Sequence, residues 1–120
     1  MSKKLQLSAH MKIRPGRLEE FKRQAAVIIE QAKAKDPGTL QYDWFLSSDK
    51  TECEVREAYE SPEALLAHVA NIYEARDTLF EKYATDHFMV FYGDPSPEIL
   101  QKATAMGVRL KLFSFLQGLT

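Results

Sequence analysis

Residues 54–73 constrain the fold more than any other part of the sequence, because they combine a strand pattern, an abrupt helix start and a helix that carries a histidine. Side chains alternate between the two faces of a strand. One face of this strand therefore carries Cys53, Val55, Glu57 and Tyr59. A buried carboxylate must be paired or protonated, so Glu57 on this apolar face is a candidate functional group.

The tripeptide Ser61-Pro62-Glu63 predicts where the following helix begins. A serine hydroxyl accepts a hydrogen bond from a free amide of the first turn, and proline fits the first helical position. Beyond it, a stripe of side chains repeats at helical spacing: Leu65, His68, Val69 and Ile72. His68 is thus expected on or beside the helix face that meets the sheet, where it shares one space with Glu57 and Tyr59.

The rest of the chain extends this unit into a βαββαβ order. Alternation of apolar and polar residues predicts strands over residues 4–14, 39–47 and 51–60, and a short apolar run predicts a fourth strand over residues 87–92. Helical periodicity predicts helices over residues 17–35 and 62–83, and the second of these could break near Asn71. Leu40, Tyr42, Trp44 and Leu46 are expected on one face of the second strand. The fold class is therefore α+β, a ferredoxin-like antiparallel sheet with its helices on one face.

The other sheet face is expected to bind a second copy of the chain. The fourth strand is apolar on both sides over residues 87–92, and Phe45 adds an aromatic side chain to the outer face of the second strand. An exposed apolar patch of this kind usually marks an interface. We therefore predict a homodimer packed through its sheets.

A C-terminal segment follows this core. Ser96-Pro97-Glu98 repeats the helix-start pattern, so a short helix is expected up to about Met106, with Gly107 as its stop. Residues 108–112 alternate as a strand. This segment could cover a sheet edge of its own subunit or reach across to the partner.

Composition narrows the functional classes. A chain of 120 residues fits one domain, and its net charge of −1 without a basic face argues against nucleic acid as a partner. Cys53 is the only cysteine, which excludes an internal disulfide. No apolar run fits a membrane span or a signal peptide, so we expect a cytoplasmic protein that does not bind a membrane.

Several of these segments together resemble one known family. Glu57-Ala58-Tyr59-Glu60-Ser61, followed by Ala64-Leu65-Leu66-Ala67-His68, is similar to the signature of the antibiotic biosynthesis monooxygenase (ABM) domain. Residues 14–21 resemble the first strand-to-helix junction of that family, and residues 36–38 its second turn. The resemblance covers residues 4–94 and implies a dimeric α+β barrel. We expect a single ABM-like domain over residues 1–120, with residues 95–120 as an extension.

The resemblance also implies an activity: oxidation of a quinol or polyketide-like aromatic molecule by O₂, without metal, flavin or other cofactor. His68 and Glu57 would be the catalytic residues: His68 would be the base or a hydrogen-bond partner of the substrate, and Glu57 or Tyr73 would orient the substrate. Tyr59, Tyr42 and Trp44 would hold the aromatic ring. Asn71 and Tyr73 stand where many relatives carry a polar motif with a second histidine, which Tyr73 replaces here.

Each of these residues also has a structural interpretation. His68 could simply fix the helix to the sheet, and Glu57 could be paired with a backbone amide or with Tyr73. The aromatic residues could be core side chains whose polar atoms are satisfied locally. The chain would then be a non-enzymatic small-ligand-binding or stress-response protein, or a dimeric structural module.

Metal and haem sites are not expected. His10, His68 and His87 come from different elements, and no short-spaced ligand pair exists. His10 should point away from the helix layer that holds His68. By resemblance, a haem site would need a tryptophan where this sequence has Tyr59.

Overall fold

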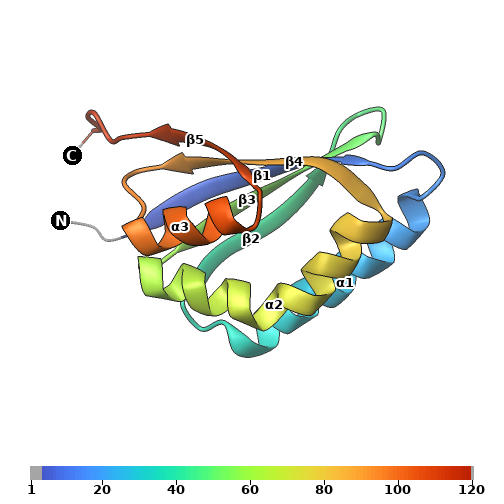
Figure 1. Cartoon of the computed structure of the whole chain (residues 1–120), viewed down its shortest axis with the longest axis horizontal. Coiled ribbons are helices and arrows are strands. Elements are labelled where there is room, and N and C mark those ends of the chain that lie inside the picture. Colours follow the sequence, from blue (N-terminus) through green and yellow to red (C-terminus); the bar gives the residue numbers. More distant parts are fainter. Residues whose placement is uncertain (1–3, 120) are drawn as a thin grey trace.

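The computed structural model describes residues 4–119 and shows one sheet whose helices all cover the same face (Figure 1). The elements are β1 (Leu5–Ile13), α1 (Leu18–Lys35), β2 (Thr39–Leu46), β3 (Glu52–Tyr59), α2 (Pro62–Lys82), β4 (Ala84–Tyr92), α3 (Pro97–Ala105) and β5 (Arg109–Phe113). The strand order is β2-β3-β1-β4-β5, and the first four strands pair antiparallel. The α+β ferredoxin-like prediction is confirmed. Residues 1–3 and 120 of the expected domain lie outside the described residues.

Alternation along β1 places the core. Its odd-numbered residues from Leu5 to Ile13 are buried against the helices, while Gln6 and Lys12 on the opposite face are exposed. Phe21 and Ile28 of α1 are also buried in this core. The pattern read from the sequence therefore gives the correct inner face of the central strand.

The helix α2 begins where the Ser-Pro-Glu pattern predicts. The Ser61 hydroxyl accepts a hydrogen bond from the Ala64 amide at 3.2 Å, and Pro62 opens the helix. The helix then runs without interruption to Lys82, so the expected break near Asn71 is wrong. Asparagine is a weak helix former, but the Asn71 side chain donates to the Lys35 carbonyl and to Asp36, and these tertiary bonds hold it on the helix.

Two β-bulges change the predicted strands. The β2–β3 register shifts between Thr39 and Gln41, so Leu40 is 56% exposed and does not share the buried face of Tyr42 and Trp44. The β4 strand begins at Ala84, earlier than expected, and its register with β1 also shifts. Asp86 has a φ of 59° at this shift. A bulge adds one residue and re-aims its neighbours, which brings His87 to the helix side of the sheet.

The C-terminal segment covers an edge of its own sheet. The Ser96 hydroxyl accepts from the Ile99 amide, α3 follows, and Gly107 has a φ of 72° just after the helix. The strand β5 then pairs parallel with β4. The sequence left open whether this segment covers its own sheet or reaches a partner, and in this structure β5 pairs with β4 of the same chain.

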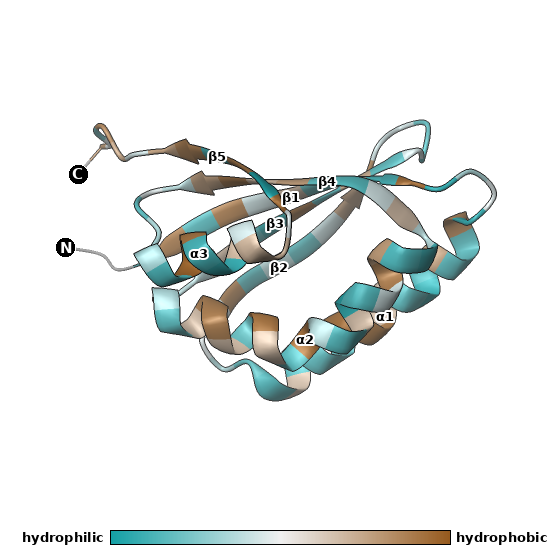
Figure 2. Cartoon of the chain, in the orientation of Figure 1, coloured by the Kyte–Doolittle hydropathy of each residue, from teal (hydrophilic) through white to brown (hydrophobic). Residues whose placement is uncertain are grey.

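The outer sheet face carries exposed aromatic side chains. Phe45, Tyr92 and Phe113 are 53%, 42% and 46% exposed, and His10 stacks on Phe88 on the same face at 4.5 Å. In Figure 2, brown apolar segments are visible in β4 and β5. In the described part of the chain, no helix is long and apolar enough to cross a membrane.

Candidate functional site

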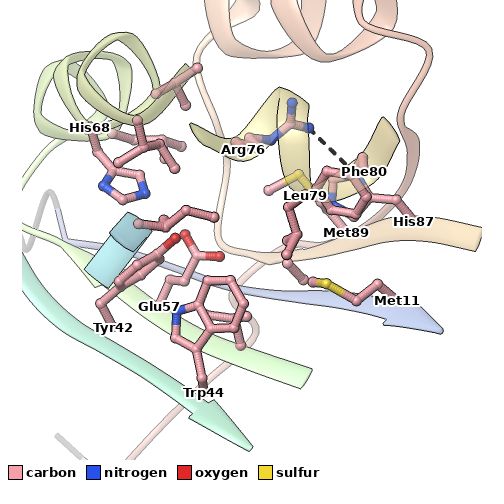
Figure 3. A pocket seen from close by; sticks show the side chains of 16 residues that line it. Met11, Tyr42, Trp44, Glu57, His68, Arg76, Leu79, Phe80, His87 and Met89 are labelled. Atoms are coloured by element: carbon pink, nitrogen blue, oxygen red, sulfur yellow. Dashed lines mark hydrogen bonds between the residues drawn. The ribbon is translucent and has the colours of Figure 1, made fainter. Parts of the chain in front are cut away.

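A small pocket, partly open to solvent, lies between α2 and the inner face of the sheet. Its wall is apolar over most of its extent, with Met11, Leu79 and Met89 among the lining residues. A few polar side chains converge on it: Tyr42 and Trp44 from β2, Glu57 from β3, His68 and Arg76 from α2, and His87 from β4 (Figure 3). An apolar cavity with a few convergent polar groups is the usual form of a small-molecule site.

His68 is held by a buried carboxylate behind it. Its Nδ1 lies 2.6 Å from Oδ2 of Asp36, and the two side chains are 2% and 1% exposed. The amide of Asn71 donates to the other oxygen of Asp36. Because a carboxylate accepts hydrogen bonds, the proton of the neutral ring sits on Nδ1, and Nε2 is left with a free lone pair.

The charge state of His68 follows from two opposing effects. Burial lowers the pKa of His68, and the hydrogen bond and charge of Asp36 oppose that shift. The net direction is downward, so the ring is neutral near pH 7 and can accept a proton at Nε2. A histidine oriented by a carboxylate in this way has the geometry of a general base.

Glu57 is a second group that can exchange a proton. It is 7% exposed, and burial raises its pKa to about 7, against the opposing effects of the Tyr59 hydrogen bond and of Arg76. The Tyr59 hydroxyl donates to Oε1 of Glu57 at 2.5 Å. Tyr59 itself is fully buried and does not line the cavity, so it positions Glu57 and does not provide a wall for a ligand.

Tyr42 and Trp44 form the aromatic wall. The Tyr42 ring meets the His68 ring edge-on at 4.6 Å and the Trp44 ring at 5.9 Å. Burial raises the pKa of Tyr42 well above its usual value, so its hydroxyl stays protonated. The indole Nε1 of Trp44 is buried and forms no well-aligned hydrogen bond within residues 4–119, although it lies close enough to the Tyr42 hydroxyl to oppose the rise in the pKa of that group. This N–H group is available to an oxygen atom of a ligand.

Arg76 is a site residue that the sequence analysis missed. Within residues 4–119, no carboxylate lies within 4.0 Å of it; its guanidinium donates to Nδ1 of His87 at 3.4 Å and lies 5.1 Å from the Phe80 ring centre. Burial and the charge of Arg76 lower the pKa of His87 to about 3, so His87 is neutral. Arg76 follows Ile72 by one helical turn, so the apolar stripe could have been extended to find it.

The remaining predicted site residues lie outside the cavity. Tyr73 is 51% exposed on the surface of α2, and its side chain lines neither this cavity nor a neighbouring one. The Asn71 side chain does not line the cavity; it donates to Asp36, which in turn holds His68. His10 lies on the outer face near Glu54, apart from His68 and His87. Over the described range, no group of three or more His, Cys, Asp or Glu side chains is arranged to hold a metal ion.

Comparison with known proteins places this geometry in a family. The sequence model described as antibiotic biosynthesis monooxygenase matches residues 6–88. The chain belongs to this family. The resemblance seen in the sequence around Glu57 and His68 is therefore confirmed. No curated protein matches the chain significantly.

Several solved structures share the fold. MupZ from Pseudomonas fluorescens is 25% identical with a TM-score of 0.79, and the match covers 99% of this chain and 95% of that one. A proposed antibiotic biosynthesis monooxygenase from Nitrosomonas europaea is also 25% identical, with a TM-score of 0.68 over 81% of this chain and 95% of that one. PA3566 from Pseudomonas aeruginosa is 24% identical, with a TM-score of 0.65, and the match covers 76% of this chain and 93% of that one. The MupZ match thus extends over the C-terminal helix and strand, which the ABM sequence model does not reach.

Proposed function

We propose that the protein is a cofactor-independent monooxygenase that oxidises an electron-rich aromatic molecule, such as a quinol or a polyketide-like phenol, in the cavity beside His68. The observation that carries this proposal is the Asp36–His68 pair, which presents a neutral imidazole to an apolar cavity. Membership of the ABM family, which includes monooxygenases, supports it.

The proposed reaction needs no external reductant. Nε2 of His68 takes the proton of a substrate hydroxyl, and Asp36 stabilises the imidazolium that forms. The phenolate then passes electrons to O₂. The substrate supplies four electrons in all; one oxygen atom enters the product and the other leaves as water.

The other polar groups of the cavity hold and orient the substrate. Tyr42 and Trp44 pack against the ring, and the Trp44 N–H donates to a substrate oxygen. Arg76 stabilises negative charge on the substrate, because its guanidinium is largely buried and has no carboxylate within 4.0 Å among residues 4–119. Glu57, held by Tyr59, orients a substrate hydroxyl and can pass on its proton.

Oxygen uptake tests the proposal. Purified protein is mixed with a panel of hydroquinones, anthrones and phenols in an oxygen electrode, and products are weighed by mass spectrometry. We expect uptake proportional to protein concentration and a product that carries one added oxygen atom. A panel member that binds tightly without any O₂ consumption would favour the alternative function, a non-enzymatic small-ligand-binding or stress-response protein. The unpaired indole N–H of Trp44 favours that alternative, since it is a binding group that requires no chemistry.

We also propose that the protein acts as a homodimer in the cytoplasm, with residues 1–120 forming one domain. The burial of Ile99 in one cluster with Leu5 and Leu7 of the central strand supports the single domain. The free and buried Cys53 fits a reducing compartment.

The dimer makes a prediction about the outer sheet face. Replacing Phe45 with aspartate places a charge among exposed aromatic side chains, so light scattering at micromolar concentration should change from twice the monomer mass to the monomer mass. The matched control is Val27→Asp on α1, which is 44% exposed on the helix layer and should stay dimeric. A wild-type protein that is monomeric under these conditions would refute the dimer.

A further inference from the structure

The C-terminal helix forms one wall of a second pocket. This pocket, partly open to solvent, lies between α2, β4 and α3 and is bounded by apolar side chains such as Leu66, Phe91, Ile99 and Met106. Figure 1 shows α3 beside the first turns of α2, on the helix side of the sheet. The buried side of α3 faces this space through Ile99 and Ala103, which stand one turn apart. The cavity therefore depends on residues that lie after the part of the chain matched by the ABM sequence model.

The two cavities adjoin one another. Leu65, Val69, Arg76 and Met89 line both of them. Methionine and arginine have long unbranched side chains with several rotatable bonds, so this wall can shift around a ligand. A molecule that is longer than one cavity can thus extend from the space beside His68 into the space under α3.

The charges of the second cavity favour an anion. Among the residues that the structure describes, Arg76 and Lys102 are its only ionisable lining residues, and no acidic side chain lines it. Among residues 4–119, neither cation has a carboxylate within 4.0 Å. Lys102 is exposed, which puts it at the mouth of the cavity, whereas Arg76 is at the junction between the two spaces. The space between the two cations is apolar.

We propose that the cavity under α3 binds the apolar chain of an elongated substrate that ends in a carboxylate. The chain lies against Phe91, Ile99 and Met106, and the carboxylate pairs with Lys102 at the mouth. The aromatic head reaches the cavity beside His68, with Arg76 next to its anionic oxygen. This assignment rests on the proposed function for the chemistry of the head group, but the binding that it describes does not require turnover.

Binding of decanoate tests the proposal by calorimetry. Wild-type protein should bind decanoate, and Ala103→Phe should abolish measurable binding because the ring fills the cavity. The matched control is Ala105→Phe, which makes the same change on the exposed side of α3 and should bind as wild type does. Decanoate binding that is equal in all three proteins, or absent from wild type, would overturn the proposal.

A charge variant provides a second readout that does not depend on packing. Lys102→Gln should weaken decanoate binding by roughly threefold, as expected for an exposed ion pair, and should leave decanol binding unchanged. Lys111→Gln on β5 is the control and should affect neither ligand. Equal losses for decanoate and decanol would overturn the role of Lys102. Decanoate binding without any O₂ uptake across the aromatic panel would support the binding site under α3 and refute the proposed oxidation. The experiment therefore distinguishes failure of the binding site from failure of the oxidation.

Discussion

Replacing His68 with alanine is expected to lower the rate of O₂ uptake with an active quinol by about 10²- to 10⁴-fold, the usual contribution of a general base. The affinity for the quinol should change little, because Tyr42, Trp44 and Arg76 still hold it. The rate is measured with the oxygen electrode. Affinity is measured by quenching of the fluorescence of Trp44, the only tryptophan of the chain, which lines the cavity.

The controls separate a base from a structural histidine. His10→Ala removes a histidine from the outer sheet face and should retain wild-type rates. Added imidazole should restore part of the activity of His68→Ala, because the truncation leaves room beside Asp36 for a free imidazole. Asp36→Asn should also lower the rate, through loss of the carboxylate that orients the ring. A His68→Ala protein that folds, binds quinol and still consumes O₂ at the wild-type rate would contradict the assignment.

Replacing Glu57 with glutamine is expected to remove the loss of folding stability that wild type suffers when the buried Glu57 carboxyl ionises at higher pH. Burial raises the pKa of Glu57 from 4.5 to about 7, so between these values the folded protein binds a proton that the unfolded chain has released. The free energy of unfolding therefore falls as pH rises through this window. The loss is complete above pH 7 and amounts to about 3 kcal/mol.

Urea unfolding at pH 4.5 and pH 8.5 measures this effect. Between the two pH values, the stability of Glu57→Gln relative to wild type should increase by about 3 kcal/mol, whatever constant offset the new amide introduces. A second variant, Tyr59→Phe, tests whether the Tyr59 hydroxyl controls the pKa of Glu57. It removes the hydroxyl that lowers the pKa of Glu57, so the stability of that variant should fall more steeply with pH than that of wild type. If Glu57→Gln and wild type differ by the same amount at both pH values, the buried carboxyl does not titrate as described.

Local patterns in the sequence were sufficient for the scaffold. Alternation in β1 and β3, and the Ser-Pro-Glu start of α2, each depend on neighbouring residues, so the sequence alone predicts them. The same alternation predicts that Tyr59 and Glu57 share a face, but the expected partner of Glu57, a backbone amide or Tyr73, is wrong: the Tyr59 hydroxyl donates to Glu57. The same alternation placed Glu57 on the apolar face of its strand and so made it a candidate functional residue.

The features that the sequence did not predict depend on tertiary structure. Asp36 looked like a turn residue, and only the packing of α1 against α2 brings it to His68. The shifts at Leu40 and Asp86 are bulges, which change the register without a fixed sequence pattern. Arg76 was hidden because a charged residue on a helix is ordinarily assigned to the solvent side.

The central position of β1 has a consequence for how the chain folds. This strand is synthesised first, yet it lies between β3 and β4 and pairs with residues as distant as Tyr59 and Tyr92. Neither pairing forms until a long loop has closed, and such non-local contacts slow folding. The cavity beside His68 needs β2, β3, α2 and β4 in place, so we expect it to form late in folding. Because β5 pairs only with β4 in the described sheet, we expect the second cavity to form after the first.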